Sequence, residues 1–202
     1  MSGLIARKKE DKRNRLLDAA NILFTENGVS STTIAEICNH AGIAKGTFYL
    51  YFKDKEDILR ALTKRISLTI LKTTYQKVKD TDLDFGDKII LMADSLLDLF
   101  QNDPDMLTVM KKDFIWPISE EEFLTTDDET MSLIRNNIEE YAKRISITEH
   151  QILVRLYALI SMLCSIAYSS IIDHFPDTID SLKPELFSML RKAFEKENST
   201  NS

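Results

Sequence analysis

TTIAEICNHAGIAKGTFYLYFKDKEDIL, residues 32–59, contains two short helical patterns on either side of a glycine. In the first pattern, apolar residues recur at helical spacing and end one residue before Gly42, where a helix C-cap is expected. The second pattern runs from Lys45 to about Phe52. Two helices joined by a three-residue turn that contains a glycine have the spacing of a helix-turn-helix. The stretch therefore predicts a helix-turn-helix over residues 33–52.

The second helix of this motif has two different sides. On a helical wheel of 100° per residue, Phe48 and Phe52 point the same way, into a small core. The opposite side carries Gly46, Thr47, Tyr49 and Leu50. An exposed leucine beside a glycine is unfavourable on a helix that faces water. It is favourable on a helix that contacts base edges, because a thymine methyl makes apolar contacts. We therefore expect this side to read the DNA major groove.

Side chains that could bind phosphate surround this surface. The residues we expect to do so are Thr32, Thr33, Lys45, Tyr51 and Lys55. The threonines precede a helix N-terminus, whose free N–H groups attract anions. A cation such as Lys55 is disfavoured near the start of the next helix, so a phosphate neighbour would explain it. The alternatives are that the threonines are only caps, the tyrosines are half-buried and Lys55 is solvated.

The net charge of −6 is distributed unevenly along the 202 residues. Residues 1–65 have a net charge of +4 and the remainder −10. A small basic unit on a larger acidic body is typical of a polyanion-binding module joined to a domain with another task, although chance clustering remains an alternative.

The composition favours a soluble helical protein. Hydrophobic residues make up 44% and charged residues 29% of the chain, which argues against disorder. Five Gly and four Pro are too few for the turns of an all-β protein. Two cysteines cannot form a disulfide framework, and the start of the chain lacks the apolar core of a signal peptide, so we expect a cytoplasmic protein.

Apolar periodicity predicts an all-α chain of about nine helices. Outside the motif, the expected helices are 10–27, 54–79, 85–101, 104–112, an acidic region ending near 145, 148–174 and one that begins near Pro184.

The N-terminal segment resembles a known family. The run from Ala19 to Leu59, with NG, TT, AG, KGTFYxYF and K-x-K in order, closely resembles the N-terminal domain of the tetracycline-repressor family of bacterial regulators. The resemblance implies a DNA-binding domain over residues 1–55 and a linking helix over 56–79. It also implies a helical domain over 80–197 that binds an effector and dimerises, followed by a tail at 198–202.

The resemblance also implies which residues face DNA, and two departures from the family pattern limit it. The implied positions are Thr33, Lys45, Gly46, Thr47, Tyr49, Leu50, Tyr51 and Lys55. Ala44 stands where the family often has serine, which removes a helix cap. Leu50 and Tyr51 stand where polar or histidine side chains are frequent, so no base preference carries over.

The second domain offers weaker signals. The helix 148–174 is apolar nearly all round and, with the last helix, could form half of a four-helix dimer interface. The residues predicted for this interface are Leu156, Ile160, Leu163, Leu186, Phe187, Leu190 and Phe194. The alternative is that they are core of a single subunit. Candidate effector-lining residues are Phe114, Trp116, Phe123, Tyr141, Tyr157 and Met162, and most such aromatics are ordinary core.

Membrane, enzyme and metal functions are disfavoured by the residues present. The uncharged run from Leu156 to Ile172 has 17 residues and four serines, whereas a spanning helix needs about 20 apolar residues, so we expect a buried or subunit-interface helix. The three histidines have no nucleophile or metal-ligand partner at a recognised spacing. We expect no catalytic site, cofactor or metal.

The sequence thus predicts a homodimeric regulator that binds double-stranded DNA and is released by a small-molecule effector, most simply a repressor. The first alternative is a DNA-binding regulator without an effector, controlled by protein contacts or acting as an activator. The second is a helical enzyme or interaction protein whose basic segment is incidental.

Overall fold

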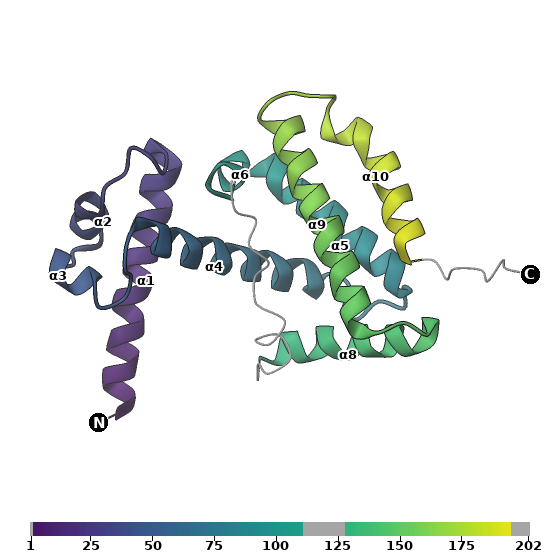
Figure 1. Cartoon of the computed structure of the whole chain (residues 1–202), viewed down its shortest axis with the longest axis horizontal. Helices are drawn as coiled ribbons and strands as arrows, with labels where there is room; N and C mark the ends of the chain where they lie inside the picture. Colours follow the sequence, from purple (N-terminus) through teal and green to yellow (C-terminus); the bar gives the residue numbers. More distant parts are fainter. Residues whose placement is uncertain (1, 111–127, 195–202) are drawn as a thin grey trace, which may run out of the picture. The chain divides into compact units, whose positions relative to one another are not determined.

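The computed structural model describes residues 2–110 and 128–194, and in these ranges the chain is all-α, with nine helices and no strand (Figure 1). The helices are α1 (Ser2–Asn27), α2 (Ile34–Ala41), α3 (Lys45–Phe48), α4 (Lys55–Gln76), α5 (Phe85–Asn102), α6 (Pro104–Met110), α8 (Glu129–Ile145), α9 (Glu149–Ile171) and α10 (Ile179–Phe194). The predicted fold class is confirmed for the described residues.

Three helix boundaries differ from the predicted ones by four residues or more. α1 begins at Ser2 rather than Glu10. α3 ends at Phe48, because the N–H groups of the next residues bond three residues back and so form turns rather than an α-helix. α10 begins at Ile179, ahead of Pro184, since the Thr178 hydroxyl accepts a hydrogen bond from a backbone N–H of its first turn.

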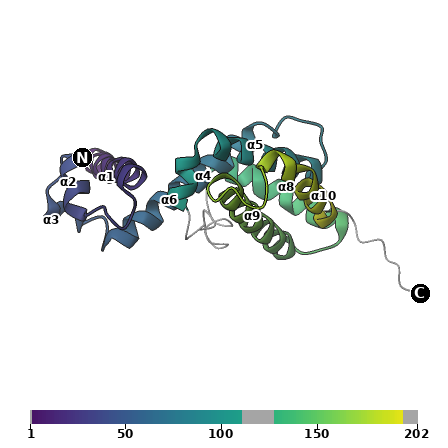
Figure 2. The same cartoon turned by 90° about the horizontal axis from the view of Figure 1, so that it is seen from above.

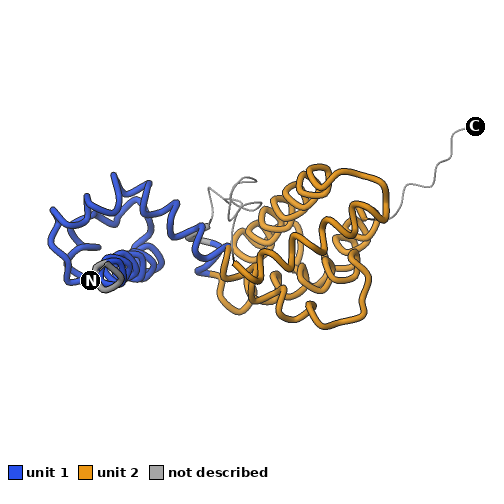
Figure 3. Tube along the Cα trace, turned by 90° about the horizontal axis from the view of Figure 1, so that it is seen from below, with its two compact units in different colours: residues 1–67, 105–117 blue, residues 68–104, 118–202 orange. Residues whose placement is uncertain are grey.

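The described residues divide into two units (Figure 3). Unit 1 holds residues 2–67 and 105–110, and unit 2 holds residues 68–104 and 128–194. The division falls inside α4, between Ser67 and Leu68, so one continuous helix contributes to both units.

Unit 1 is built on α1 and α2, which pack against each other. Its core consists of Leu16, Leu17, Ala19, Ala20, Phe24, Ile37, Cys38, Ala41, Ile43, Phe48, Phe52, Ile58 and Leu62, all buried. Each fully buried Leu, Ile or Phe contributes roughly 1.5–3 kcal/mol of transfer free energy. Two of these side chains, Phe48 and Phe52, come from the segment that the sequence assigns to DNA, and they fix its back to the domain.

In unit 2, α5, α9 and α10 pack against one another and α8 packs against α9 (Figure 2). Tyr141 of α8 stacks on Phe85 of α5, with ring centroids 4.1 Å apart and planes at 11°. The Tyr141 hydroxyl donates a hydrogen bond to the Phe194 carbonyl oxygen at the end of α10. Three helices are thereby joined around one buried aromatic ring.

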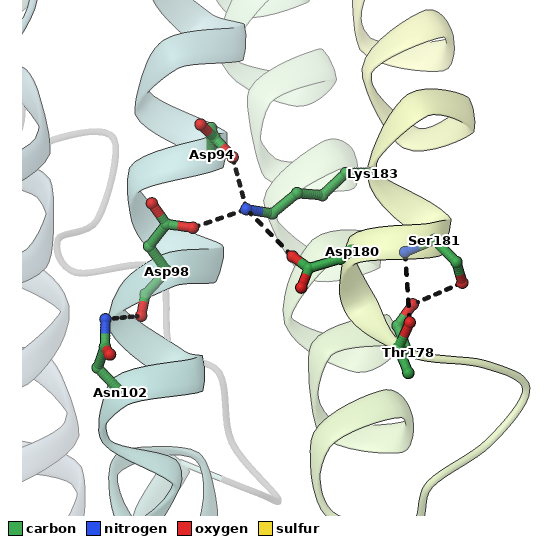
Figure 4. A network of polar contacts seen from close by, with 7 residues as sticks. All are labelled: Asp94, Asp98, Asn102, Thr178, Asp180, Ser181 and Lys183. Carbon is green, nitrogen blue, oxygen red and sulfur yellow. Dashed lines mark hydrogen bonds and ion pairs between the residues drawn. The ribbon is translucent and has the colours of Figure 1, made fainter.

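An ion-pair network holds α10 to α5 (Figure 4). The Lys183 ammonium lies 2.8 Å from Asp94 and 2.6 Å from Asp98 of α5, and 3.7 Å from Asp180 of its own helix. Burial alone would lower the pKa of Lys183, but the hydrogen bonds and charges of Asp94 and Asp98 outweigh it and raise the pKa. Lys183 therefore remains charged and connects the two helices.

Candidate nucleic-acid interface

Caps at both ends of α2 fix where this helix begins and ends, and the second cap begins the turn to α3. Thr33 is the N-cap: its hydroxyl oxygen accepts from the Glu36 N–H, and the Glu36 carboxylate accepts from the Thr33 N–H at 2.7 Å. The Thr33 hydroxyl also donates to the Glu36 carboxylate at 2.8 Å, and this hydrogen bond, followed by that from the Thr33 N–H, lowers the pKa of Glu36. Gly42 ends the helix in the left-handed conformation, with φ of 62°, as the sequence predicted. Arg15 of α1 donates to the Ala41 carbonyl at 2.5 Å and so fastens this turn to α1.

The segment after the turn has the two sides that the sequence predicted. Phe48 is fully buried and Phe52 is 3% exposed, whereas Tyr49 is 52% and Leu50 74% exposed. The orientation of this segment is therefore confirmed, while its contact with DNA remains a prediction. Tyr49 and Leu50 are among the most exposed large hydrophobic side chains of the described residues. Such exposure has a cost in water unless a partner covers the surface.

Gly46 lies in α3 with open space around it. A Cβ atom built at this position meets no heavy atom within 4 Å. Nothing within the described structure therefore requires a glycine here, and glycine costs about 1 kcal/mol relative to alanine inside a helix. The close approach of a partner to the backbone would account for that cost.

Other side chains frame the same surface. Thr33, Lys45 and Gly46 are exposed, and Thr47 and Tyr51 are half-buried. Together with Tyr49 and Leu50 they give a surface with one ammonium, several hydroxyl groups and one large apolar side chain. This combination can bind phosphates at its rim and contact base edges at its centre.

Thr32 requires a correction. Its side chain is 1% exposed, and its hydroxyl lies within hydrogen-bond distance of the carbonyl oxygens of Leu23 and Gly28, at 3.1 and 2.9 Å. The hydroxyl therefore holds the end of α1 to the loop that follows it. The interpretation of Thr32 as a phosphate contact does not fit this burial.

Lys55 requires a second correction. Its ammonium donates to the carbonyl oxygens of Val29 at 2.7 Å, Thr32 at 3.0 Å and Ser30 at 3.3 Å. The cation at the start of α4 is thus surrounded by backbone carbonyls of the α1–α2 loop. These carbonyls, rather than a phosphate, explain its position against the helix dipole.

The six residues predicted to line an effector site differ in burial, or fall outside the residues that the structure describes. Phe114, Trp116 and Phe123 fall outside the residues that the structure describes. Tyr141 is 4% exposed, and its ring stacks on Phe85 in the core of unit 2. Tyr157 is 53% exposed on α9, and Met162 is half-buried.

Most of the predicted dimer residues are buried in their own subunit. Leu156, Leu163, Leu186, Leu190 and Phe194 are each at most 7% exposed and pack within unit 2, so their assignment to a dimer interface is corrected. Ile160 and Phe187 are half-buried. The apolar side chains that do face outward are Val154 and Tyr157 of α9 and Met189 of α10, at 52%, 53% and 45% exposed. We call these three the outer α9–α10 face.

By length and composition alone, α9 is apolar enough to cross a membrane. Of the residues in its most apolar 18-residue stretch, 28% are buried within the subunit.

Among the described residues, no group of three or more His, Cys, Asp or Glu side chains could hold a metal. Burial raises the pKa of the Cys164 thiol to about 12, which leaves it unreactive as a nucleophile.

Comparison with known proteins points to one family. Residues 16–62 match the profile of the family described as bacterial regulatory proteins, tetR family. The chain is 36% identical over 74 residues to the fatty acid metabolism regulator protein of Bacillus subtilis (strain 168), a match that covers 37% of this chain and 38% of that protein. It is 45% identical over 49 residues to the HTH-type transcriptional regulator AcrR of Shigella flexneri, covering 24% and 23% of the two chains. The chain thus spans less than two fifths of the length of either relative.

A solved structure shares the fold over most of the chain. The transcriptional regulator FadR from Bacillus subtilis, in complex with stearoyl-CoA, superposes with a TM-score of 0.59 at 19% identity, covering 89% of this chain and 97% of that one. An identity this low shows the fold alone.

Proposed function

We propose that the chain is a homodimeric transcriptional regulator of the tetR family of bacterial regulatory proteins, because residues 16–62 match the profile of that family. In this proposal it represses genes in the cytoplasm by binding an operator, and a small-molecule effector releases it. The observation that carries the proposal is the outward surface of Gly46, Tyr49 and Leu50, held from behind by two buried phenylalanines.

The proposed reading of DNA follows from this surface. The segment Lys45–Phe52, which we call the α3 segment, enters the major groove. There Leu50 contacts a thymine methyl, and Tyr49 and Thr47 supply hydroxyl groups. The open backbone at Gly46 allows the segment to approach the bases closely. Lys45 and the exposed Thr33 at the start of α2 bind phosphates and fix the orientation of the domain.

Two copies of the chain are needed to read two half-sites. A two-fold pair of α3 segments contacts successive major grooves about 34–36 Å apart when the half-sites are one helical turn apart. The outer α9–α10 face is the surface that we propose to pair the subunits. It is apolar, and each of its three side chains is about half exposed within the subunit.

The effector is proposed to act through α4, because this continuous helix contributes residues to both units. A ligand that binds one α4 arrangement better than another shifts the equilibrium by the difference of its two affinities. Stearoyl-CoA, which the similar structure contains, is the first compound to test. A rise in the thermal midpoint with stearoyl-CoA, but not with coenzyme A alone, would support an acyl-binding site. No shift with any compound of a broad library would favour a regulator without an effector.

Selection from a randomised duplex library tests the DNA-binding function. The wild-type chain should enrich one sequence with two related half-sites. The Tyr49→Ala variant should bind the enriched duplex at least about tenfold more weakly, which corresponds to about 1.4 kcal/mol. Ile22→Ala is the matched control, because Ile22 is an exposed apolar residue of the same unit, at 41%, but lies on α1. A wild-type chain that enriches no sequence would contradict the proposal.

A further inference from the structure

The first turns of α1 extend beyond the core of unit 1 and carry a cluster of cations. Residues 7–13 read RKKEDKR, with a net charge of +3. The side chains of residues 6–12 are all exposed, and burial in the core begins at Leu16. Figure 1 shows this part of α1 continuing past α2 and α3 toward the N-terminus. The extension is thus a solvent-exposed, positively charged helix attached to the domain that carries the proposed DNA-reading surface.

The side of α1 that packs on the domain becomes cationic where the helix leaves it. Leu17, Ala20 and Phe24 form a buried stripe at helical spacing. Toward the N-terminus the same stripe continues with Arg13 and then Lys9. The Arg13 guanidinium lies over the ring of Phe52, 5.5 Å from its centroid. Since Phe52 anchors the α3 segment, this contact places the cationic side of α1 next to the base of the DNA-reading surface.

The remaining cations of α1 and α4 in unit 1 each take part in an interaction. Arg15 and Lys55 donate to backbone carbonyls. Arg60 pairs with Asp57, and Arg65 pairs with Asp18 at 2.8 Å. The α4 residue Lys64 also takes part in an interaction.

The cations of the extension differ. Arg7, Lys8, Lys9 and Lys12 make no ion pair with any side chain that the structure describes. The first turn of α1 also lacks an acidic residue, although the helix dipole would favour one there. The positive charge of these four side chains is therefore not paired with a carboxylate of the described part of the chain.

We infer that residues 7–13 form a second DNA-contacting surface, which binds backbone phosphates beside the bases that α3 reads. This inference rests on the proposed function and adds a contact that the helix-turn-helix does not supply. DNA is the partner because the surface is cationic, lies on the DNA-binding unit and is next to the anchor of α3. Contacts with phosphate carry no sequence information, so the extension contributes affinity and lengthens the bound site without changing the sequence that is read.

The test replaces three exposed lysines of the extension, Lys8, Lys9 and Lys12, by glutamine in the full chain. Glutamine keeps a helix propensity close to that of lysine, so the fold should be retained, which circular dichroism and thermal unfolding check. The probe is the duplex that the wild-type chain enriches from the randomised library. Each lost phosphate contact lowers the salt slope of log K by about 0.9, so the three lysines of each subunit, lost from both subunits of the bound homodimer, lower it by roughly 5.

Three results are expected of the triple variant. Its salt slope falls by roughly five, its hydroxyl-radical footprint loses protection in both half-sites, and its enriched sequence is unchanged. The control replaces Lys77, Lys79 and Lys192, three exposed lysines outside unit 1, and should retain the wild-type slope.

Other results would overturn the inference. A folded triple variant with the wild-type slope and footprint contradicts it, as does a variant that enriches a different sequence. Equal losses in the control would show an effect of net charge alone and would also contradict it. If the wild-type chain enriches no duplex, the proposed function itself fails, and the inference fails with it.

Discussion

The Lys55 ammonium lies 2.7 Å from the carbonyl oxygen of Val29, 26 residues earlier in the chain. The same ammonium bonds the carbonyls of Ser30 and Thr32, so one side chain at the start of α4 holds the whole α1–α2 loop. Because this loop leads directly into α2, Lys55 supports the proposed DNA-reading surface from within unit 1.

Replacing Lys55 by methionine should therefore destabilise the chain. Hydrogen bonds that involve a charged group contribute about 1.5–3 kcal/mol when buried, and the partial exposure of Lys55 reduces this to roughly 1–2 kcal/mol. Urea unfolding measures the loss. Lys53→Met, which changes an exposed lysine two residues away, should stay within about 0.5 kcal/mol of wild type. Equal stability of the two variants would show that the carbonyl contacts of Lys55 contribute little.

Gly46→Ala should separate stability from DNA binding. The added Cβ enters open space, so the free energy of unfolding should rise by about 0.5–1 kcal/mol, while affinity for the enriched duplex should fall. Thermal unfolding and fluorescence anisotropy measure the two effects. Gly42→Ala serves as a contrast: with φ of 62° and Arg15 Nη2 3.0 Å from the new Cβ, it should destabilise by about 1–2 kcal/mol. A Gly46→Ala chain that binds DNA as well as wild type would remove the argument for close approach.

Asp128 should make the stability of unit 2 depend on pH. The Lys72 ammonium, and after it the Met131 N–H, lower the pKa of Asp128 below its ordinary 3.8. The folded chain therefore keeps this carboxylate charged at a pH where the unfolded chain would protonate it. The resulting stabilisation is present above pH 3.8 and is lost as the pH falls through the lowered pKa.

Asp128→Asn tests this dependence, because asparagine can still cap α8 but cannot pair with Lys72. At pH 7 the variant should be roughly 0.5–1 kcal/mol less stable, since both partners are partly exposed. The difference should shrink below pH 3.8 in unfolding experiments at several pH values. Glu129→Gln, with the same loss of charge one residue away, should show a smaller difference at pH 7. A difference for Asp128→Asn that is independent of pH would contradict the pairing.

Val154→Glu should separate the subunits. A carboxylate on the outer α9–α10 face must be desolvated when the face is covered, so the dissociation constant of the dimer should rise by at least about tenfold. Analytical ultracentrifugation at micromolar concentration measures it. Leu133→Glu on α8, where Leu133 is 41% exposed, is the matched control and should leave assembly unchanged. A wild-type chain that is monomeric would exclude this dimer, and a Val154→Glu chain that is still dimeric would place the interface elsewhere.

How much the sequence predicts depends on whether the deciding contacts are local. The burial of Phe48 and Phe52 and the left-handed turn at Gly42 follow from spacing within one short segment, and the structure has both. The roles of Thr32 and Lys55 depend on partners 4–26 residues away in the chain, which no local pattern shows.

The dimer residues illustrate a second limit. α9 is apolar nearly all round, so periodicity cannot say which side packs on its own subunit. The structure places Leu156 and Leu163 inward and Val154 and Tyr157 outward. Because α9 has no polar side, its packing against α5 and α10 decides which of its residues face inward. This packing cannot be predicted from the periodicity of α9 alone.

The sequence enriched by a Leu50→Arg variant, compared with that of wild type, tests most directly whether the outward side of the segment Lys45–Phe52 reads bases. Leu50 is 74% exposed. An arginine there should select guanine through its O6 and N7 atoms, with about 1–3 kcal/mol of discrimination. We predict that base preference changes at one symmetric pair of positions, one in each half-site, while the others are retained. An unchanged consensus, bound by the folded variant with wild-type affinity, would contradict the account.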